Sequence, residues 1–313
     1  MLVPADHRPL DLLVVGDANP DLVLGGDVVP RFGQVEQLLS SADLVLGGSA
    51  AIVAAGAARL GLRTALAARV GTDAFADLVL AAVADRGVDV RAVRRDPEVP
   101  TGLTVVLSAP HDRAILTLPG AIPGLRAEHV DDVLLSSTRH LHIAGWFLMP
   151  DLVPATGDLF RRARAMGATT SLDTNWDPSG EWTGVLELLA VTDVFLPNLA
   201  ELLAVTGQDP AAVEAAATLV RGQGALLAVK AGAAGAIGWD DSGRHTAPVP
   251  PVEVVDTTGA GDSFVAGFLA GWLGGRPFAE ALRWAAAAGS LSTRSAGGTA
   301  AQADQHELLA ALA

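Results

Sequence analysis

The sequence predicts an α/β fold with a mostly parallel central sheet and helices on both of its faces. Short, almost fully apolar runs alternate with longer stretches in which apolar residues recur at helical spacing. This alternation of strands and helices is typical of a parallel sheet that is covered on both faces. Half of the 313 residues are apolar and only 18% are charged, so the chain can bury a large core.

The expected elements follow one another along the chain. An apolar strand is predicted at 12–15 and a short alternating strand at 22–24. Further strands are predicted at 63–71, 141–148, 169–175, 192–198 and 226–232. Helices are predicted at 50–61, 73–88, 150–167, 263–272 and 278–290, and a glycine closes the first of them.

Two segments, at about 20–46 and 99–118, interrupt the alternation. The second is predicted to form a β-hairpin around the sequence APHD. Short strands outside the β/α core predict a small accessory sheet, which we interpret as a lid and as a candidate surface for a homodimer. No internal repeat and no linker rich in Pro, Gly or Ser divides the chain, so residues 1–313 are expected to form a single domain with this discontinuous β lid.

The composition excludes several classes of function. The formal net charge is −14, so nucleic acid is not an expected partner, because phosphate binding needs clustered basic residues. The chain has no cysteine, which excludes disulfides, thiol nucleophiles and cysteine-ligated metals, and its seven histidines show no metal-binding spacing and are expected in turns or on the surface. No signal-peptide pattern and no apolar run of roughly 18 residues is present, so we expect no membrane contact and a cytoplasmic location.

The segment DTTGAGDSF, residues 256–264, carries glycines and hydroxyl side chains just before a predicted helix. The backbone N–H groups of Gly259, Ala260 and Gly261 can converge there on an anion, and the helix dipole favours this. Asp262 has three candidate roles: N-cap of the helix, metal ligand, or base for a substrate hydroxyl. The segment lacks the Gly-Lys-Ser/Thr of a Walker A loop.

Other segments occur with this one in a fixed order that spans nearly the whole chain. They are GGSAAIVAAGAARLG from residue 47, ARVGTDAFAD from 68, VPTGLTVVL from 99, LDTN from 172, PNLAE from 197 and VKAGAAGA from 229. The ordered set resembles the ribokinase-like (PfkB) family of carbohydrate and nucleoside kinases. The resemblance implies a ribokinase-like fold and an ATP-dependent kinase that phosphorylates a hydroxyl of a small sugar or sugar-like polyol.

The resemblance also implies roles on the catalytic side. Asp262 would be the general base, and the N–H groups of Gly259, Ala260 and Gly261 would form an anion hole. Asn198 and Glu201 match a motif that organises Mg²⁺ and phosphate, although their spacing also suits a helix capping box.

The nucleotide and cation sites are implied in the same way. Lys230, Gly232 and Gly235 would lie on the ATP side, with a plain turn as the alternative. Asp256, with Thr258, matches a site for a monovalent cation such as K⁺, and a brace within the loop is the alternative.

On the acceptor side, Asp21 matches the family's substrate-binding aspartate, and Gly47 and Gly48 match its paired glycines. Asn19, two residues before Asp21, is a further candidate for the sugar, and Asn175 is a candidate for phosphate or acceptor contacts. Asx-turns and strand-end turns are the alternative roles for Asn19 and Asp21 and for Asn175.

The chain departs from the family pattern at Ile52, where many members carry Asn, which puts a ribose-type substrate in doubt. The alternatives are a nucleoside kinase, with Trp146 or Phe32 as an aromatic wall, and a non-catalytic protein that senses sugar or nucleotide. Trp146 at a strand end is also typical of a core residue.

Overall fold

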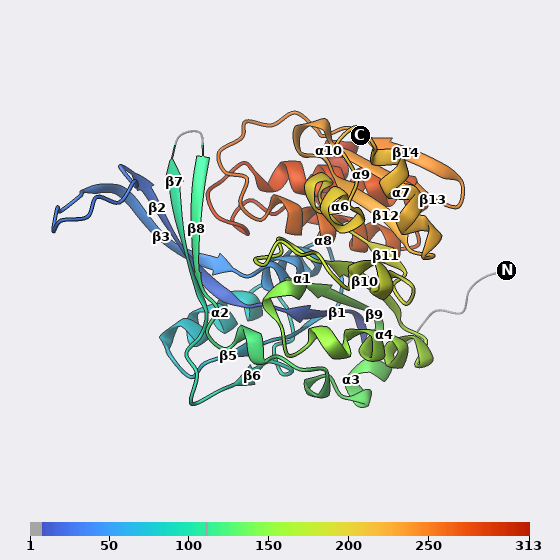
Figure 1. The fold of residues 1–313 in the computed structure, drawn as a ribbon, viewed down its shortest axis with the longest axis horizontal. Helices are drawn as coiled ribbons and strands as arrows, with labels where there is room; N and C mark the ends of the chain where they lie inside the picture. Colours follow the sequence, from blue (N-terminus) through green and yellow to red (C-terminus); the bar gives the residue numbers. More distant parts are fainter. Residues whose placement is uncertain (1–7, 110–111) are drawn as a thin grey trace.

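The computed structural model describes residues 8–109 and 112–313. Its largest sheet has eight strands in the order β14-β13-β12-β11-β10-β9-β1-β4 (Figure 1). Neighbours from β12 to β4 pair in parallel, and β13 and β14 add an antiparallel edge. The strands are β1 (Leu10–Gly16), β4 (Thr64–Ala67), β9 (Thr138–Ala144), β10 (Thr169–Asp173), β11 (Val194–Phe195), β12 (Leu226–Lys230), β13 (Ala236–Asp240) and β14 (Gly243–Ala247). The predicted mostly parallel sheet is confirmed.

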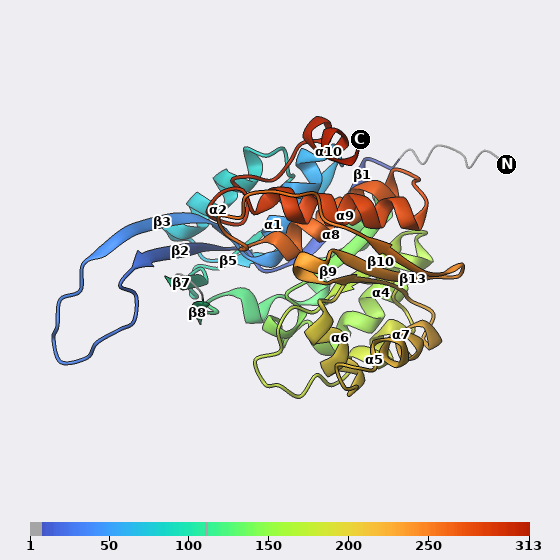
Figure 2. The same cartoon turned by 90° about the horizontal axis from the view of Figure 1, so that it is seen from above.

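Helices cover both faces of this sheet, as Figure 2 shows from above. One layer holds α1 (Ser49–Arg59), α2 (Ala74–Ala84), α8 (Ala260–Leu273), α9 (Phe278–Ser292) and α10 (Gln305–Leu312). The other holds α3 (Asp132–Ser136), α4 (Thr156–Ala165), α5 (Val185–Leu189), α6 (Leu199–Thr206) and α7 (Val213–Gly222). Among the described residues, none of the helices has both the length and the apolar character that crossing a membrane requires.

A second sheet has four strands in the order β3-β2-β7-β8 and projects from one side of the molecule (Figure 1). Its strands are β2 (Asn19–Gly26), β3 (Leu39–Gly47), β7 (Leu103–Ala109) and β8 (Asp112–Leu118). They come from the two segments that interrupt the β/α alternation, and β2 pairs antiparallel with β3 and parallel with β7. Residues 110–111 of the predicted APHD turn lie outside the described residues. Two short strands, β5 (Arg69–Val70) and β6 (Arg94–Arg95), form a separate pair.

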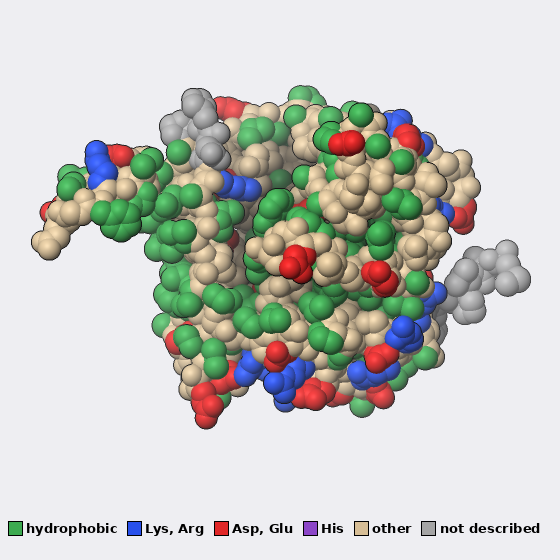
Figure 3. Space-filling model, viewed as in Figure 1, with side chains coloured by type: hydrophobic (Ala, Val, Ile, Leu, Met, Phe, Trp, Pro, Cys, Tyr) green, Lys and Arg blue, Asp and Glu red, His purple; other side chains and the backbone are tan. Residues whose placement is uncertain are grey.

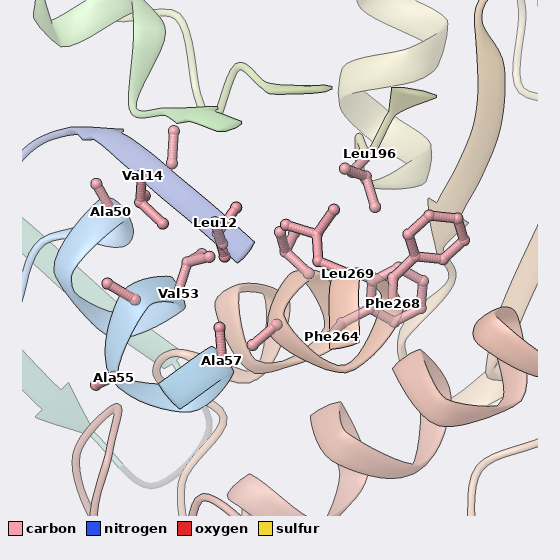
Figure 4. Packing of buried hydrophobic residues seen from close by; sticks show 14 of the residues in the cluster. Leu12, Val14, Ala50, Val53, Ala55, Ala57, Leu196, Phe264, Phe268 and Leu269 are labelled. Carbon is pink, nitrogen blue, oxygen red and sulfur yellow. The ribbon is translucent and has the colours of Figure 1, made fainter. Parts of the chain in front are cut away.

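Close packing of α1 and α8 against β1 fixes the position of the α8 N-terminus. Leu12 of β1 lies beside Val53 of α1 and Leu269 of α8 in the core (Figure 4). Alanine and glycine let these helices approach: a methyl group at Gly56 of α1 would come within 3.0 Å of the Ala266 Cβ of α8. The alanine-rich composition therefore has a packing role, because small side chains allow backbones to lie close together.

Two histidines of β9 are fully buried, so the expectation that all histidines lie in turns or on the surface is wrong. His140 and His142 both contact Ser171 Oγ of β10, at 2.6 Å through Nε2 and 2.7 Å through Nδ1 respectively. Burial lowers the pKa of His140 to about 3, so its ring is neutral at pH 7. The Ser171 hydroxyl gives both buried rings a hydrogen-bond partner. Because Ser171 lies on the neighbouring strand, the local sequence of β9 does not indicate this partner.

Candidate active site

Two cavities at the carboxyl ends of the parallel strands share the first turn of α8 as a wall. The larger, of about 420 Å³, is lined by Lys230, Gly261 and Phe264, together with residues of the 249–257 segment and of α9. The smaller, of about 190 Å³, is lined by Asp21, Asp262 and residues from β7 and β8. This edge of an open α/β sheet is where ligands ordinarily bind.

Asp262 lies inside the first turn of α8, so its predicted role as the N-cap is wrong. The helix begins at Ala260 rather than at residue 263, and Gly259 is the N-cap with a φ of 69°. A methyl group on Gly259 would come within 2.6 Å of Gly298 Cα, so this turn requires glycine. The Ala260 N–H, predicted as part of an anion hole, donates to Thr257 O at 3.2 Å. The other amides of this turn belong to the part of a helix whose N–H groups have no partner within it.

The Asp262 carboxyl is buried among other charged groups. Burial raises its pKa to about 7, and the hydroxyl of Ser49, which donates to Oδ1, partly opposes this rise. Asp173 and Asp17 repel the charged form, whereas Lys230 attracts it. A carboxyl group with a pKa near neutrality can gain or lose a proton at working pH, which suits a general acid or base.

We expect Asp262→Asn to raise the free energy of unfolding by about 1–2 kcal/mol at pH 8.5 and by a smaller amount at pH 5. The folded-state pKa of about 7 lies above the ordinary value of 3.8. Above pH 7 the folded protein therefore holds a buried charge that the unfolded chain keeps in water. This cost decreases as the pH falls from 7 towards 3.8, where the unfolded chain also becomes protonated. Urea unfolding at both pH values measures the effect, and an equal change at both would contradict it.

Lys230 ends β12 and lies between buried carboxylates. Its Nζ donates to Asp173 Oδ2 at 2.6 Å, and Asp173 is fully buried. Burial alone would lower the pKa of Lys230, but attraction to Asp173 and Glu201 outweighs it and raises that pKa. Its Cδ would lie 3.3 Å from a methyl group on Gly261, so the side chain runs beside the first turn of α8. Lys230 is also the only lysine of the chain, a signal in the sequence that marks this position as special.

Asn198 and Glu201 form a reciprocal capping box at the start of α6. Glu201 N donates to Asn198 Oδ1 at 2.9 Å, and Asn198 N donates to Glu201 Oε2 at 2.8 Å. The capping alternative is therefore realised, and it fixes both side chains. Glu201 is nonetheless only 5% exposed, and burial raises its pKa, which is unusual for a simple cap.

The predicted acceptor residues line or frame the smaller cavity. Asn19 Nδ2 donates to Asp21 Oδ1 at 3.0 Å and to Thr104 Oγ1 at 3.1 Å, so it braces Asp21. Burial, followed by repulsion from Asp17, raises the pKa of Asp21 to about 7. A methyl group on Gly47 would come within 2.0 Å of Asp21 Oδ1, so the missing side chain makes room for this carboxylate.

Gly48 precedes α1 and is held close to Asp17. It has a φ of 83°, and a methyl group there would come within 2.8 Å of Asp17 O. The Asp17 carboxylate accepts the N–H groups of Ser49 and Ala50, each at 3.0 Å. Asp17, which directly follows β1, thus caps α1. This role was not predictable from local sequence, because Asp17 lies more than 30 residues before the amides of Ser49 and Ala50.

Asn175 and Ile52 also line the smaller cavity. The side chain of Asn175 is bonded within the protein, since Oδ1 accepts the Gly145 N–H at 2.7 Å and Nδ2 donates to Ser49 Oγ at 2.7 Å. Ile52 gives the cavity an apolar wall beside Gly298. Asn175 was predicted from the sequence, whereas Ser49, which connects it to Asp262, was not.

Asp256 braces the loop that leads to α8. Its Oδ1 accepts the N–H and hydroxyl of Thr258, and its Oδ2 accepts the Gly297 N–H at 2.9 Å. Burial acts to raise the pKa of Asp256, but these bonds hold it below its ordinary value. Arg113 of β8 donates to Thr258 Oγ1 at 3.0 Å, so it links the four-stranded sheet to this loop. No sequence motif indicated Arg113.

The remaining predicted residues lie in the larger cavity, in the core or on the surface. Gly232 and Gly235 line the larger cavity with Lys230, in the turn between β12 and β13. Trp146 is buried in the core, and its Nε1 donates to Thr156 Oγ1 at 2.9 Å. Phe32 is 95% exposed, so its proposed role as an aromatic wall of the acceptor cavity is wrong.

Comparison with known proteins identifies the sequence family. The family described as pfkB family carbohydrate kinase matches residues 10–305. The chain is 30% identical to a ribokinase of Arabidopsis thaliana, over 97% of this chain and 81% of the relative. The solved structure of Arabidopsis thaliana ribokinase with ribose and ATP superposes with a TM-score of 0.86 at 27% identity, covering 97% of this chain and 98% of that one. An E. coli protein assigned as ribokinase II, in complex with ATP and Mg²⁺, has a TM-score of 0.84 at 25% identity, covering 97% and 99%.

Proposed function

This chain belongs to the pfkB family of carbohydrate kinases, and on that premise we propose that it transfers the γ-phosphoryl group of ATP to a hydroxyl of a small sugar, with Asp262 as the general base. The observation that carries the proposal is the first turn of α8, which is the shared wall of the two cavities. ATP occupies the larger cavity and the sugar the smaller one. The reacting groups then meet at Asp262.

The acceptor is oriented by carboxylate and amide groups of the smaller cavity. Asp21, braced by Asn19, accepts hydroxyl hydrogens of the sugar, and Gly47 and Gly48 bring the backbone close to the ring. Asp262 takes the proton as the hydroxyl oxygen bonds to phosphorus and the bond to the leaving ADP breaks. Ile52 favours a sugar with an apolar edge at that wall.

Backbone amides of the first turn of α8, with Lys230, bind the phosphates and their developing charge. The helix dipole adds to this attraction, so a chain with a net charge of −14 can still hold ATP. Gly232 and Gly235 keep the ATP side open. Gly259 provides the tight turn that precedes α8 and its first-turn amides.

Mg²⁺ bound with ATP supplies charge neutralisation on the phosphates. Among residues 8–109 and 112–313 no group of three acidic or histidine side chains could hold a metal alone, which suits an ion that keeps most of its waters. Asn198 and Glu201 hold those waters in our proposal, because the capping bond of Glu201 uses one oxygen, Oε2. A monovalent cation such as K⁺ orders the loop beside Asp256.

The four-stranded sheet closes over the sugar as a lid on a single domain, and the contact between Arg113 and Thr258 supports this role. Closure excludes water, which would otherwise consume ATP. Because the reaction needs a supply of ATP, we propose the cytoplasm as its location.

We expect the lid sheet to form a homodimer. Exposed apolar side chains gather on it (Figure 3), and they are Val29, Phe32, Val35, Leu38, Leu39, Leu44, Ile115, Leu116 and Leu118. A patch of this kind and the free edges β3 and β8 favour pairing with a second copy. Light scattering after size exclusion should give twice the 31.9 kDa chain mass and a monomer for Phe32→Asp. Val133→Asp, at an exposed site on α3, is the matched control, and a wild-type monomer at tens of micromolar would contradict the proposal.

A screen of ADP release tests the function itself. Pentoses, hexoses, keto-acid sugars, inositols and nucleosides are offered with Mg-ATP, with and without K⁺. We expect release with at least one sugar, and release that is about 10²–10⁴-fold slower in the Asp262→Asn variant. Binding of sugars without any ADP release would favour a sensor, and release with nucleosides alone would favour a nucleoside kinase.

A further inference from the structure

We propose that Ser49 and Asn175 are positioning residues for Asp262, joined to it in a hydrogen-bond relay that starts at the backbone of Gly145. The relay runs from the Gly145 N–H to Asn175 Oδ1 at 2.7 Å, from Asn175 Nδ2 to Ser49 Oγ at 2.7 Å, and from the Ser49 hydroxyl to Asp262 Oδ1. It connects the ends of β9 and β10 with the first turns of α1 and α8. This inference rests on the proposed role of Asp262 as the base.

The direction of every bond in the relay follows from its first member. A backbone N–H can only donate, so the Asn175 atom that receives it is the carbonyl oxygen. The other side-chain atom of Asn175 is therefore the NH₂ group, which donates to Ser49 Oγ. Since Ser49 Oγ accepts at that point, its own hydrogen is directed to Asp262. The relay thus favours the ionised carboxylate and keeps Asp262 an acceptor at Oδ1.

The relay is anchored at each of its members. Ser49 N donates to Asp17 Oδ2 at 3.0 Å, which fixes the serine at the start of α1. Asn175 has a φ of 54°, a left-handed conformation that asparagine tolerates better than most residues and that places its amide between two partners. With Oδ1 of Asp262 held by Ser49, Oδ2 is the oxygen that takes the proton of the sugar hydroxyl.

The other charged groups that face Asp262 cannot replace the relay. Asp173 at the end of β10 and Asp17 after β1 repel the carboxylate. Lys230 of β12 attracts it, but the Lys230 ammonium is bonded to Asp173. The Ser49 hydroxyl is accordingly the neutral donor that opposes the rise in the pKa of Asp262 caused by burial. Loss of this hydroxyl should therefore raise the pKa of the base.

The test is the pH dependence of kcat/KM for Ser49→Ala, Ser49→Thr and Asn175→Asp. Removing the hydroxyl in Ser49→Ala should move the acidic limb up by about one pH unit, and Ser49→Thr should restore it. Asn175→Asp keeps the acceptor for Gly145 N–H but turns the donor into an acceptor. The Ser49 hydrogen then turns away from Asp262, and the limb should move up by at least as much.

A control variant, a folding measurement and the Asp262→Asn variant separate the possible results. Ser136→Ala, at an exposed serine of α3, should keep the wild-type limb. Thermal unfolding shows whether each variant is folded, and Ser49→Thr supplies the comparison if Ser49→Ala is not. An unchanged limb in Ser49→Ala and Asn175→Asp, with Asp262→Asn inactive, would overturn the relay alone. Activity retained in Asp262→Asn would overturn the proposed base and the relay with it.

Discussion

Replacing Asp262 with Asn should lower kcat by about 10²–10⁴-fold while changing the affinity for ATP only a few-fold. The amide has the shape of the carboxyl group and can accept the Ser49 hydroxyl, but it cannot take a proton from the sugar. ATP binds through the backbone amides and Lys230 in our proposal, and both remain in the variant. Initial rates of ADP release give kcat, and calorimetric titration with ATP gives the affinity.

Asp158→Asn is the matched control for this substitution. Asp158 lies on α4, is mostly exposed and pairs with Arg161 on the surface, so its neutralisation should leave kcat unchanged. Turnover in Asp262→Asn that equals the wild type would show that another group takes the proton. A loss of ATP binding together with turnover would instead assign Asp262 to the phosphate site.

The fold class was predictable because its signals are local. Each strand of the central sheet is a short apolar run, and each main helix has its own periodicity. The four-stranded sheet was predictable only as two segments that interrupt the alternation of strands and helices. Its strand order was not predictable, because the pairing of β2 with β7 joins residues about 80 positions apart. The early start of α8 at Ala260 was missed, since Gly259 takes the cap in place of Asp262.

Site residues were predictable where a single sequence motif contains them. The sequence therefore identified Asp262 and Lys230 as candidates. It missed Asp17, Ser49 and Arg113, because each acts on a residue from a distant segment. Asp17 bonds to Ala50, Ser49 to Asp262 and Arg113 to Thr258. These hydrogen bonds form only when folding brings β1, α1, α8 and β8 together at one edge of the sheet.

Lys230→Met should destabilise the protein by about 3–5 kcal/mol at pH 7, the usual cost of removing one partner from a buried ion pair. Lys230 is bonded to the fully buried Asp173 and attracts the buried Glu201. Methionine fills much of the same volume, so the loss comes from carboxylates that are left without a cation. Urea unfolding measures it, and Arg161→Met at the exposed pair with Asp158 should change stability by less than about 1 kcal/mol.

A double variant distinguishes lost charge from lost packing. If an uncompensated carboxylate causes the instability, Lys230→Met combined with Asp173→Asn should recover much of it, because the main unpaired charge is then gone. Equal instability in the single and double variants would point to packing. Lys230→Arg should restore the charge but only part of the stability, since a guanidinium group is larger than the ammonium that fits between Asp173 and the first turn of α8. Lys230→Met should also weaken ATP binding, because it removes the cation that neutralises these carboxylates and faces the phosphates in our proposal.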